Sequence, residues 1–202
     1  SQELAAKATA AGYFAREILP IEAPVVGDDG KPTGATQRVT ADQGIRATTR
    51  EGLAALKPVQ AGGIHTPGNS SQVSDGAAGL LYMSAEKARA HGLRPRARIR
   101  HDVVVGSDPA LVLEGPIDAT RKLLAKSKLS LRDIDVFECN EAFAAVVLAW
   151  QRAFPEIDPA RVNPNGGAIA LGHPVGATGS RLIVSALHEL ERTGKGTALI
   201  TM

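Results

Sequence analysis

The sequence predicts an α/β fold with a largely parallel sheet. In the second half of the chain, strand-like runs alternate with segments of helical periodicity, which is typical of βαβ units. One such run, residues 134–137, is apolar enough to be a buried strand and leads into an apolar helical segment. The chain has 202 residues and 44% hydrophobic content, which is enough to bury a substantial core in one large domain or two small ones.

The elements expected before residue 97 are irregular. In order, they are a helix at 1–14, a segment broken by Pro and Gly at 20–34, a helix at 46–56, a small-residue strand at 77–83 and a helix at 84–92. Ser84 is suited to cap the start of the last helix, and Gly92 is suited to end it. Loops as long as the Pro- and Gly-rich segment are usually functional or peripheral in compact enzymes.

From residue 97 onward the alternation is regular. The expected order is strand 99–105, helix 117–126, strand 134–138, helix 140–154, a glycine-rich turn at 163–180, a helix ending at Gly194 and strand 197–202. The last helix begins near residues 176–180 and has apolar residues at i, i+3 and i+4 spacing. This order predicts a layered α/β domain.

His173 lies in the glycine-rich turn, which has the sequence NPNGGAIALGHPVGATGS. Because Pro174 follows it, His173 is expected in extended backbone just before the next helix begins. The partial positive charge of a helix N-terminus favours a neutral imidazole, which can accept a proton or help to bind an oxyanion. The alternative is a core histidine in a purely structural turn.

Asn140 and Glu141 are expected at a strand-to-helix turn, at the carboxyl end of a buried strand. Ligands of open α/β sheets bind at such ends. An amide there can hold a water or an oxygen without carrying charge. The alternative for Asn140 is a helix cap.

Three segments occur in a fixed order: GNSSQVSDGAA at residues 68–78, NEAF at residues 140–143 and GGAIALGHPVGATG at residues 166–179. Together they closely resemble the motifs of the thiolase family, and their order and spacing match that family over nearly the whole chain. The resemblance implies a thiolase-like layered α/β/α fold with a mixed, largely parallel sheet, plus the remnant of a loop domain. It divides the chain into the end of a CoA-covering loop domain (1–64), the closing strand and helix of the N-terminal core domain (65–96), and the C-terminal domain (97–202), truncated before its second catalytic cysteine.

The same resemblance implies acyl transfer through a covalent acyl-cysteine, usually thiolytic cleavage of a 3-ketoacyl-CoA to acetyl-CoA and a shortened acyl-CoA. His173 would deprotonate the cysteine and help to hold the thioester oxygen, and Asn140 would position a water in the same oxyanion hole. A thiol with a pKa of about 8.5 needs such a base or a favourable field to become a thiolate. No tightly bound cofactor is implied, and CoA takes part as a substrate.

The expected CoA contacts also follow from the resemblance. Ser71 would contact the pantetheine region, and Ala142 and Phe143 would line the same channel. Arg46 begins a stretch that resembles the family pattern RxxTxExLAxL and is a further candidate. His65, a few residues before Ser71, is another candidate for the wall of this channel.

The nucleophilic cysteine of thiolases has no counterpart here. The single cysteine, Cys139, ends a buried strand where the family does not place its nucleophile, and we interpret it as a small core residue. We therefore expect roughly the second half of a thiolase, inactive by itself. The alternatives are a biosynthetic acetyl-CoA acetyltransferase, another enzyme of the superfamily such as a ketoacyl synthase, and a CoA-binding or interaction module without catalysis. The segments VVGSD and GPI favour the degradative, long-chain type.

Composition favours neither nucleic acid nor membrane as a partner. The net charge is +2, and no apolar run approaches the roughly 20 residues of a membrane span. The arginines of residues 89–100 are expected on a solvated helix end and an edge strand, and His188 is expected to be exposed. The histidine spacing does not suit a metal site. One cysteine suits a reducing compartment, so we expect a bacterial-like cytoplasmic protein, and a homodimer or homotetramer by family analogy.

Overall fold

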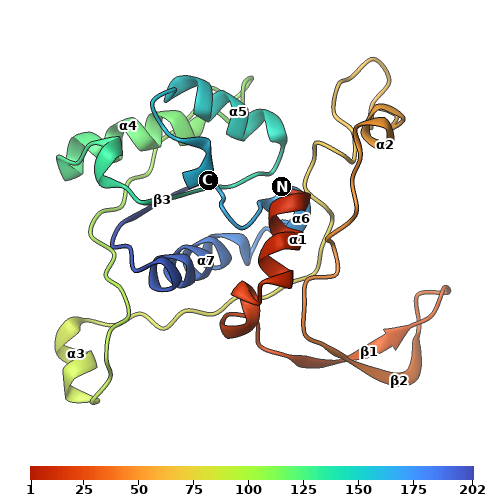
Figure 1. Ribbon diagram of the computed structural model, residues 1–202, viewed down its shortest axis with the longest axis horizontal. Helices are drawn as coiled ribbons and strands as arrows, with labels where there is room; N and C mark the ends of the chain where they lie inside the picture. Colours follow the sequence, from red (N-terminus) through yellow and green to blue (C-terminus); the bar gives the residue numbers. More distant parts are fainter.

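The computed structural model describes residues 1–202 and has an α/β architecture (Figure 1). Its α-helices are α1 (Gln2–Ala10), α2 (Arg50–Ala54), α3 (Ala85–Ala90), α4 (Gly115–Ser127), α5 (Ala144–Ala153), α6 (Ala168–Leu171) and α7 (Thr178–Thr193). Its strands are β1 (Ile21–Val26), β2 (Pro32–Val39), β3 (Val136–Cys139) and β4 (Ala198–Thr201), and its 3-10 helices are η1 (Tyr13–Arg16), η2 (Leu131–Asp133) and η3 (Pro159–Arg161). None of the helices combines the length and the apolar character needed to cross a membrane.

Strands β3 and β4 pair in parallel, with Val136 opposite Ala198 and Cys139 opposite Thr201. Helices α4 and α5 lie on one side of this pair and α7 on the other (Figure 1). The layered α/β/α arrangement predicted from the sequence is therefore present. Its sheet is small, because only a single parallel bridge, between Phe137 and Val162, extends it.

The hydrophobic core lies between the strand pair and helices α4 and α5. Trp150 of α5 is fully buried, and its ring centroid lies 5.5 Å from that of Phe137 and 5.4 Å from that of Phe154. Its indole Nε1–H donates to Thr120 Oγ1 of α4 at 2.9 Å. The aromatic cluster thus joins both helices to β3.

Removing the hydroxyl of Thr120 should leave the indole donor of Trp150 without an acceptor inside this core. We expect Thr120→Val, which keeps the shape of the side chain, to lower the free energy of unfolding by about 1–3 kcal/mol. Thr120→Ser keeps the acceptor and should cost less. Denaturant unfolding of both variants measures the difference, and equal losses would show that the hydrogen bond contributes nothing.

Alternation along β3 sends neighbouring side chains to opposite layers. Cys139 joins the aromatic core, whereas Glu138 faces α7, with its Oε2 3.9 Å from Arg181 Nη1. Asn140 comes two residues after Glu138 and lies on the same side. This face of β3, opposite the core, carries the candidate site.

Two of the predicted strands do not form. Residues 77–83 and 99–105 have no ladder partner, and Leu81 and Val104 are 79% and 83% exposed. Backbone in the extended conformation becomes a strand only when a neighbour accepts and donates its hydrogen bonds. No segment within residues 1–202 lies beside these two in register.

The segment expected to be irregular at residues 20–34 is instead the start of an antiparallel hairpin. Strand β1 pairs with β2, Ile21 lying opposite Val39, and the hairpin projects away from the layered part of the molecule (Figure 1). Its turn ends at Gly30, whose φ of +75° suits glycine. The Pro and Gly residues therefore lie in the turn and in an exposed two-stranded ribbon. The sequence pattern did not predict the pairing of these two strands.

Two helices begin later than predicted. Helix α2 begins at Arg50 because the side chain of Thr49 accepts from Gly52 N at 3.0 Å and caps it. Helix α5 begins at Ala144, not at Asn140, because the intervening backbone pairs with another segment. Ser71 N donates to Ala142 O at 2.8 Å, and an isolated antiparallel bridge joins Ser70 to Phe143.

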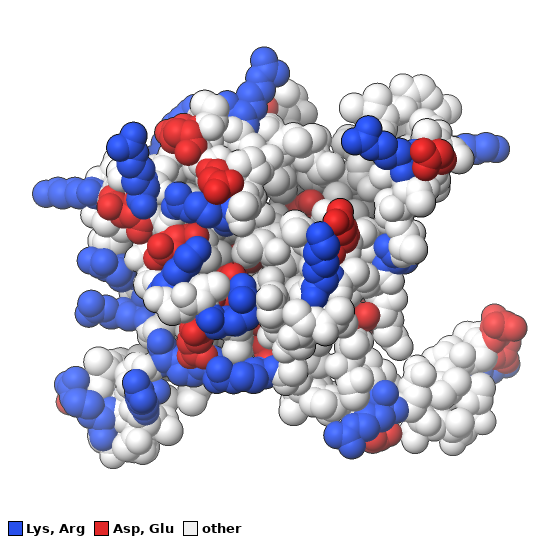
Figure 2. Space-filling model, viewed as in Figure 1, with Lys and Arg blue, Asp and Glu red and all other residues white.

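The predictions for the basic segment and for His188 need correction. Helix α3 ends as expected, but no edge strand follows it, and Arg96 instead forms a bidentate pair with Glu191 of α7. The side chain of His188 is only 11% exposed and lies 3.3 Å from Glu17, because the segment after η1 covers this part of α7. Figure 2 shows Lys and Arg interspersed with Asp and Glu over α4, whereas the charged side chains over α3 are mainly basic.

Candidate active site

The fold brings His173 and Asn140 together from segments 33 residues apart: His173 Nε2 lies 3.4 Å from Asn140 Nδ2. Asn140 directly follows β3, and its backbone N–H continues the parallel ladder by donating to Thr201 O at 2.9 Å. His173 follows Gly172, which ends α6, and precedes α7. Asn140 is buried and His173 is half-buried.

A second asparagine fixes the backbone before Asn140. Asn163 accepts from Cys139 N through its side-chain oxygen and donates to Cys139 O through its side-chain nitrogen, both at 2.9 Å. The side chain thus occupies the place of a neighbouring strand beside β3. It holds the last residue before Asn140 from the side away from β4.

Thr178, the first residue of α7, sets the proton arrangement of His173. Its hydroxyl is fully buried and donates to Pro174 O at 2.9 Å, so toward His173 Nδ1, 2.7 Å away, the oxygen acts as an acceptor. The proton of a neutral ring is then assigned to Nδ1. Nε2, which faces Asn140, is left with its lone pair free to accept a proton.

The surroundings keep the ring neutral at pH 7. Burial is the largest cause that lowers the pKa of His173 below its usual 6.5, and the positive charge of Arg181 adds to it. Burial also raises the pKa of Glu138 to about 8, although Arg181 opposes this. Glu138 is therefore mostly protonated at pH 7 and contributes little negative charge beside Arg181, although Asp42 also lies close enough for its charge to interact with Arg181. The neutral state predicted from the helix terminus thus has two further causes.

Residues 68–78 pack directly against the histidine turn, and two glycines permit the close approach. A Cβ on Gly172, whose φ is +84°, would meet the side chain of Ser74, with the two Cβ atoms 2.7 Å apart. A Cβ on Gly76 would lie 2.7 Å from Pro174 Cγ. All three motif segments therefore meet at one place.

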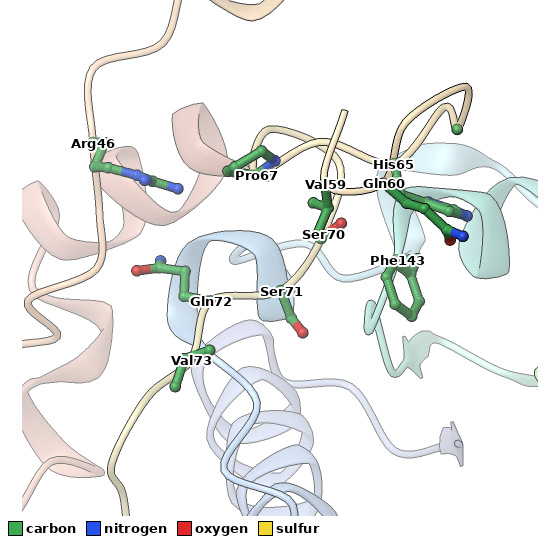
Figure 3. A pocket seen from close by; sticks show the side chains of 11 residues that line it. Arg46, Val59, Gln60, His65, Pro67, Ser70, Ser71, Gln72, Val73 and Phe143 are labelled. Carbon is green, nitrogen blue, oxygen red and sulfur yellow. The ribbon is translucent and has the colours of Figure 1, made fainter. Parts of the chain in front are cut away.

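Beside this meeting point is a cavity of about 610 Å³. It is lined by Arg46, Val59, Gln60, Gly63, His65, Pro67, Ser70, Ser71, Gln72, Val73 and Phe143. Arg46 lies at one end and Phe143 at the other, with Ser71 between them (Figure 3). The structure thus brings together three of the four predicted CoA contacts. Ala142 does not line the cavity, and it takes part only through its carbonyl, which holds Ser71.

His65 closes the same end of the cavity as Phe143. The two rings lie with centroids 4.8 Å apart and are tilted by 54° (Figure 3). The pairing with Phe143 gives His65 a fixed place on the wall, where an imidazole can meet a polar group of a ligand.

Cys139 has none of the properties of a nucleophile. Its side chain is 1% exposed, and burial raises the pKa of its thiol to about 12. It belongs to the hydrophobic core on the face of β3 opposite His173. No group of three or more His, Cys, Asp or Glu side chains is arranged to hold a metal ion.

Sequence reasoning missed Thr178 and Gln72 as parts of the site. Thr178 is visible as a hydroxyl residue at the start of the helix after His173, but its contact with Nδ1 depends on how the turn closes. Glu141, the residue after Asn140, accepts from Ile169 N of α6 at 3.0 Å through its Oε2. It therefore joins the NEAF turn to the segment that carries His173.

Two family models match the chain: "Thiolase, N-terminal domain" over residues 1–86 and "Thiolase, C-terminal domain" over residues 93–202. The chain belongs to the thiolase family. It is 46% identical over 202 residues to the steroid 3-ketoacyl-CoA thiolase FadA6 of Mycobacterium tuberculosis, covering 100% of this chain and 47% of that protein. It is 48% identical to a beta-ketoadipyl-CoA thiolase of Pseudomonas knackmussii, covering 100% of this chain and 49% of that protein.

Solved thiolase structures have the same fold. The Bacillus anthracis acetyl-CoA acetyltransferase superposes with a TM-score of 0.89 at 43% identity, covering 100% of this chain and 50% of that one. Human mitochondrial 3-ketoacyl-CoA thiolase superposes with a TM-score of 0.85 at 40% identity, and the match covers 98% of this chain and 49% of that one. This thiolase chain spans about half the length of the relatives it matches.

Proposed function

We propose that this chain forms the histidine-bearing and CoA-binding part of a thiolase that cleaves a 3-ketoacyl-CoA with free CoA. The observation that carries the proposal is the pairing of His173 Nε2 with the Asn140 amide at 3.4 Å, with Thr178 on the other ring nitrogen. A neutral base and an uncharged hydrogen-bond donor at one point are what acyl transfer to a thiol requires. His173 and Asn140 are the catalytic residues of this proposal.

In this mechanism His173 Nε2 takes the proton of a cysteine thiol, and the thiolate then attacks the keto carbon of the substrate. The bond between that carbon and the neighbouring methylene breaks, and its electron pair stays on the methylene carbon, which takes a proton from the second catalytic cysteine that the family resemblance implies. Acetyl-CoA is then the first product, and the acyl group remains on the nucleophilic cysteine. Free CoA then takes the acyl group. Asn140, directly or through a water, and the protonated His173 stabilise the oxyanion that forms in the acyl-transfer steps.

The nucleophilic thiol comes from polypeptide other than these 202 residues, because Cys139 is buried in the core behind β3. This chain without that thiol is then inactive. Residues 1–64 act as the end of a loop domain over CoA, residues 65–96 complete the N-terminal core domain, and residues 97–202 form the C-terminal domain.

The cavity between Arg46 and Phe143 supports the CoA part of the proposal. Its volume of about 610 Å³ is suited to a narrow part of a ligand, such as the pantetheine arm of CoA. Ser71 and Phe143 contact the pantetheine portion, Ala142 holds Ser71 in place, and Arg46 lies toward the nucleotide end. CoA is a substrate here, and no tightly bound cofactor is needed.

For the physiological role we propose degradation of a 3-ketoacyl-CoA in the cytoplasm, as in fatty acid β-oxidation, by a homodimer or homotetramer. Relatives named as 3-ketoacyl-CoA and beta-ketoadipyl-CoA thiolases support the cleavage direction. The alternative is condensation of acetyl-CoA, which uses the same residues in reverse. The similarity to the Bacillus anthracis acetyl-CoA acetyltransferase supports that alternative.

Acyl trapping tests the proposal. The full-length gene product is incubated with acetoacetyl-CoA, with and without free CoA, and its peptides are searched by mass spectrometry for an acetylated cysteine. We expect the acyl group on a cysteine other than Cys139, and its removal by CoA. If CoA binds but no cysteine is acylated, the chain belongs to a CoA-binding module and the catalytic proposal is wrong.

The pH dependence of acylation should show the lowered pKa of His173. Only the neutral ring accepts a proton, so the rate should rise with pH through a midpoint below 6.5 and then stay flat through pH 7. Stopped-flow measurements of the acylation rate from pH 5 to 8 record this rise and the flat part that follows it. A midpoint above 6.5 would contradict the assigned environment of the ring.

A further inference from the structure

Helix α6 directly precedes His173 in the chain and contacts Gln72, which lines the cavity. It has only four residues, Ala168–Leu171, of which the first three are buried, and Gly172 joins its end to the histidine. A helix this short has little stability of its own, because it contains barely one turn of hydrogen bonds. Its position must therefore depend on the side chains that bind it.

Gln72 is one of those side chains, and it comes from the wall of the cavity. Its Nε2 lies 2.8 Å from Ala170 O, 3.1 Å from Ile169 O and 2.8 Å from Gly44 O. All three neighbours are acceptors, so the orientation of the amide is determined: exchanging its nitrogen and oxygen would set oxygen against three carbonyls. Gln72 follows Ser71 directly and points away from Phe143 (Figure 3).

Gln2 of α1 makes a second connection between the same two segments. Its Oε1 accepts from Arg46 N at 2.7 Å, and its Nε2 donates to Ile169 O at 3.1 Å. The backbone at residues 44–46 is thus joined to α6 by two glutamine side chains. Arg46 and Gln72 both line the cavity, so two parts of its wall are connected to the helix that precedes His173.

We propose that Gln72 is a positioning residue that couples occupancy of the CoA cavity to the placement of His173 through α6. The proposal rests on the proposed function. A CoA thioester that contacts Ser71 and Arg46 steadies residues 44–46 and 70–73, and Gln72 transmits this to the carbonyls of α6. Gln72 is not a catalytic residue, because its amide hydrogens are used by three backbone carbonyls of the protein itself.

Gly44 offers a way to disturb this contact without touching the cavity. Gly44 does not line the cavity, and a Cβ on it would lie 2.5 Å from Gln72 Oε1 and 2.7 Å from Gln72 Cδ. Gly44→Ala should therefore push the Gln72 amide off α6, and Gln72→Met removes the donor directly at similar size. Gln37→Met, on the exposed strand β2, is the matched control.

Hydrogen exchange of the full-length gene product, followed by mass spectrometry with and without free CoA, tests the coupling. In the unmodified protein and in Gln37→Met, CoA should slow exchange both at residues 70–73 and at residues 167–172. In Gln72→Met and Gly44→Ala, CoA should still slow exchange at residues 70–73 but should no longer slow it at residues 167–172. Without CoA, residues 167–172 of these two variants should exchange about five- to tenfold faster, as expected for a lost hydrogen bond.

Steady-state kinetics should likewise separate CoA binding from the placement of His173. Gly44→Ala should lower kcat about five- to tenfold while the KM for CoA stays within twofold, because Ser71 and Phe143, the proposed pantetheine contacts, are not altered and the ring is misplaced. Unchanged exchange at residues 167–172, or CoA protection that persists there in both variants, would overturn the coupling. If CoA protects neither segment of the unmodified protein, both the CoA cavity and its coupling to His173 are overturned.

Discussion

Replacing His173 with alanine in the full-length gene product should abolish acylation by an acyl-CoA, with a fall in rate of roughly a thousandfold or more. The ring is the one group in the site whose free lone pair faces the Asn140 amide, and it supplies both the base and part of the oxyanion hole in the proposed mechanism. Rapid-mixing measurements of cysteine acylation, together with peptide mass spectrometry, measure the loss.

The matched control for this variant is His91→Ala. His91 caps the end of α3, is exposed, and lies in a part of the fold distant from α6 and α7 (Figure 1). Its loss should leave the acylation rate within a factor of about two, as is usual for a surface substitution. Acylation of His173→Ala at the unmodified rate would remove the role assigned to the ring.

Asn140→Ala should lower kcat by roughly 100- to 1,000-fold while KM changes little, because an oxyanion donor acts mainly in the transition state. The backbone N–H of Asn140 is held in the strand ladder by Thr201 O, so removing the side-chain amide should leave the backbone in place. Steady-state kinetics of the full-length gene product separate the two constants. A large rise in KM at constant kcat would instead make Asn140 a binding residue.

Cys139→Ala provides the neighbouring control for Asn140→Ala. The two side chains point to opposite faces of β3, and the thiol has its pKa raised to about 12 in the core. Acylation should therefore continue, with only a small loss of stability from the vacated volume. If this folded variant loses acylation, Cys139 has been assigned wrongly.

The sequence indicated that His173 and Asn140 belong to one place, and the structure brings them within 3.4 Å of each other, because chemistry and backbone requirements coincide in their motifs. His173 is flanked by glycine and proline that fix its turn, and Asn140 ends a strand whose apolar character is plain. The family resemblance and the strand-to-helix turn both indicated that they meet. The NEAF residues were nevertheless expected to begin a helix, and their pairing with Ser70 and Ser71 shows that a contact distant in sequence overrode a local pattern.

Other parts of the fold depend on contacts that no local pattern records. The extended segments 77–83 and 99–105 have strand-like composition, but a ladder requires a neighbour as well as a sequence. His188 has charged neighbours that suggest exposure, and only the packing of η1 against α7 buries it. The contacts of Thr178 and Gln72 likewise arise from the closure of turns around α6.

The raised pKa of Glu138 makes the stability of the folded site depend on pH between about 4.5 and 8. Its pKa of about 8 in the folded protein lies above the ordinary 4.5, so the folded state retains a proton that the unfolded chain has released. Stability from this group is present below pH 4.5 and declines as the pH rises through 8. His173 requires the opposite, since it works only after losing its proton. Raising the pH from 4.5 toward 8 therefore favours the neutral form of His173 while it removes the stability that Glu138 contributes in acid.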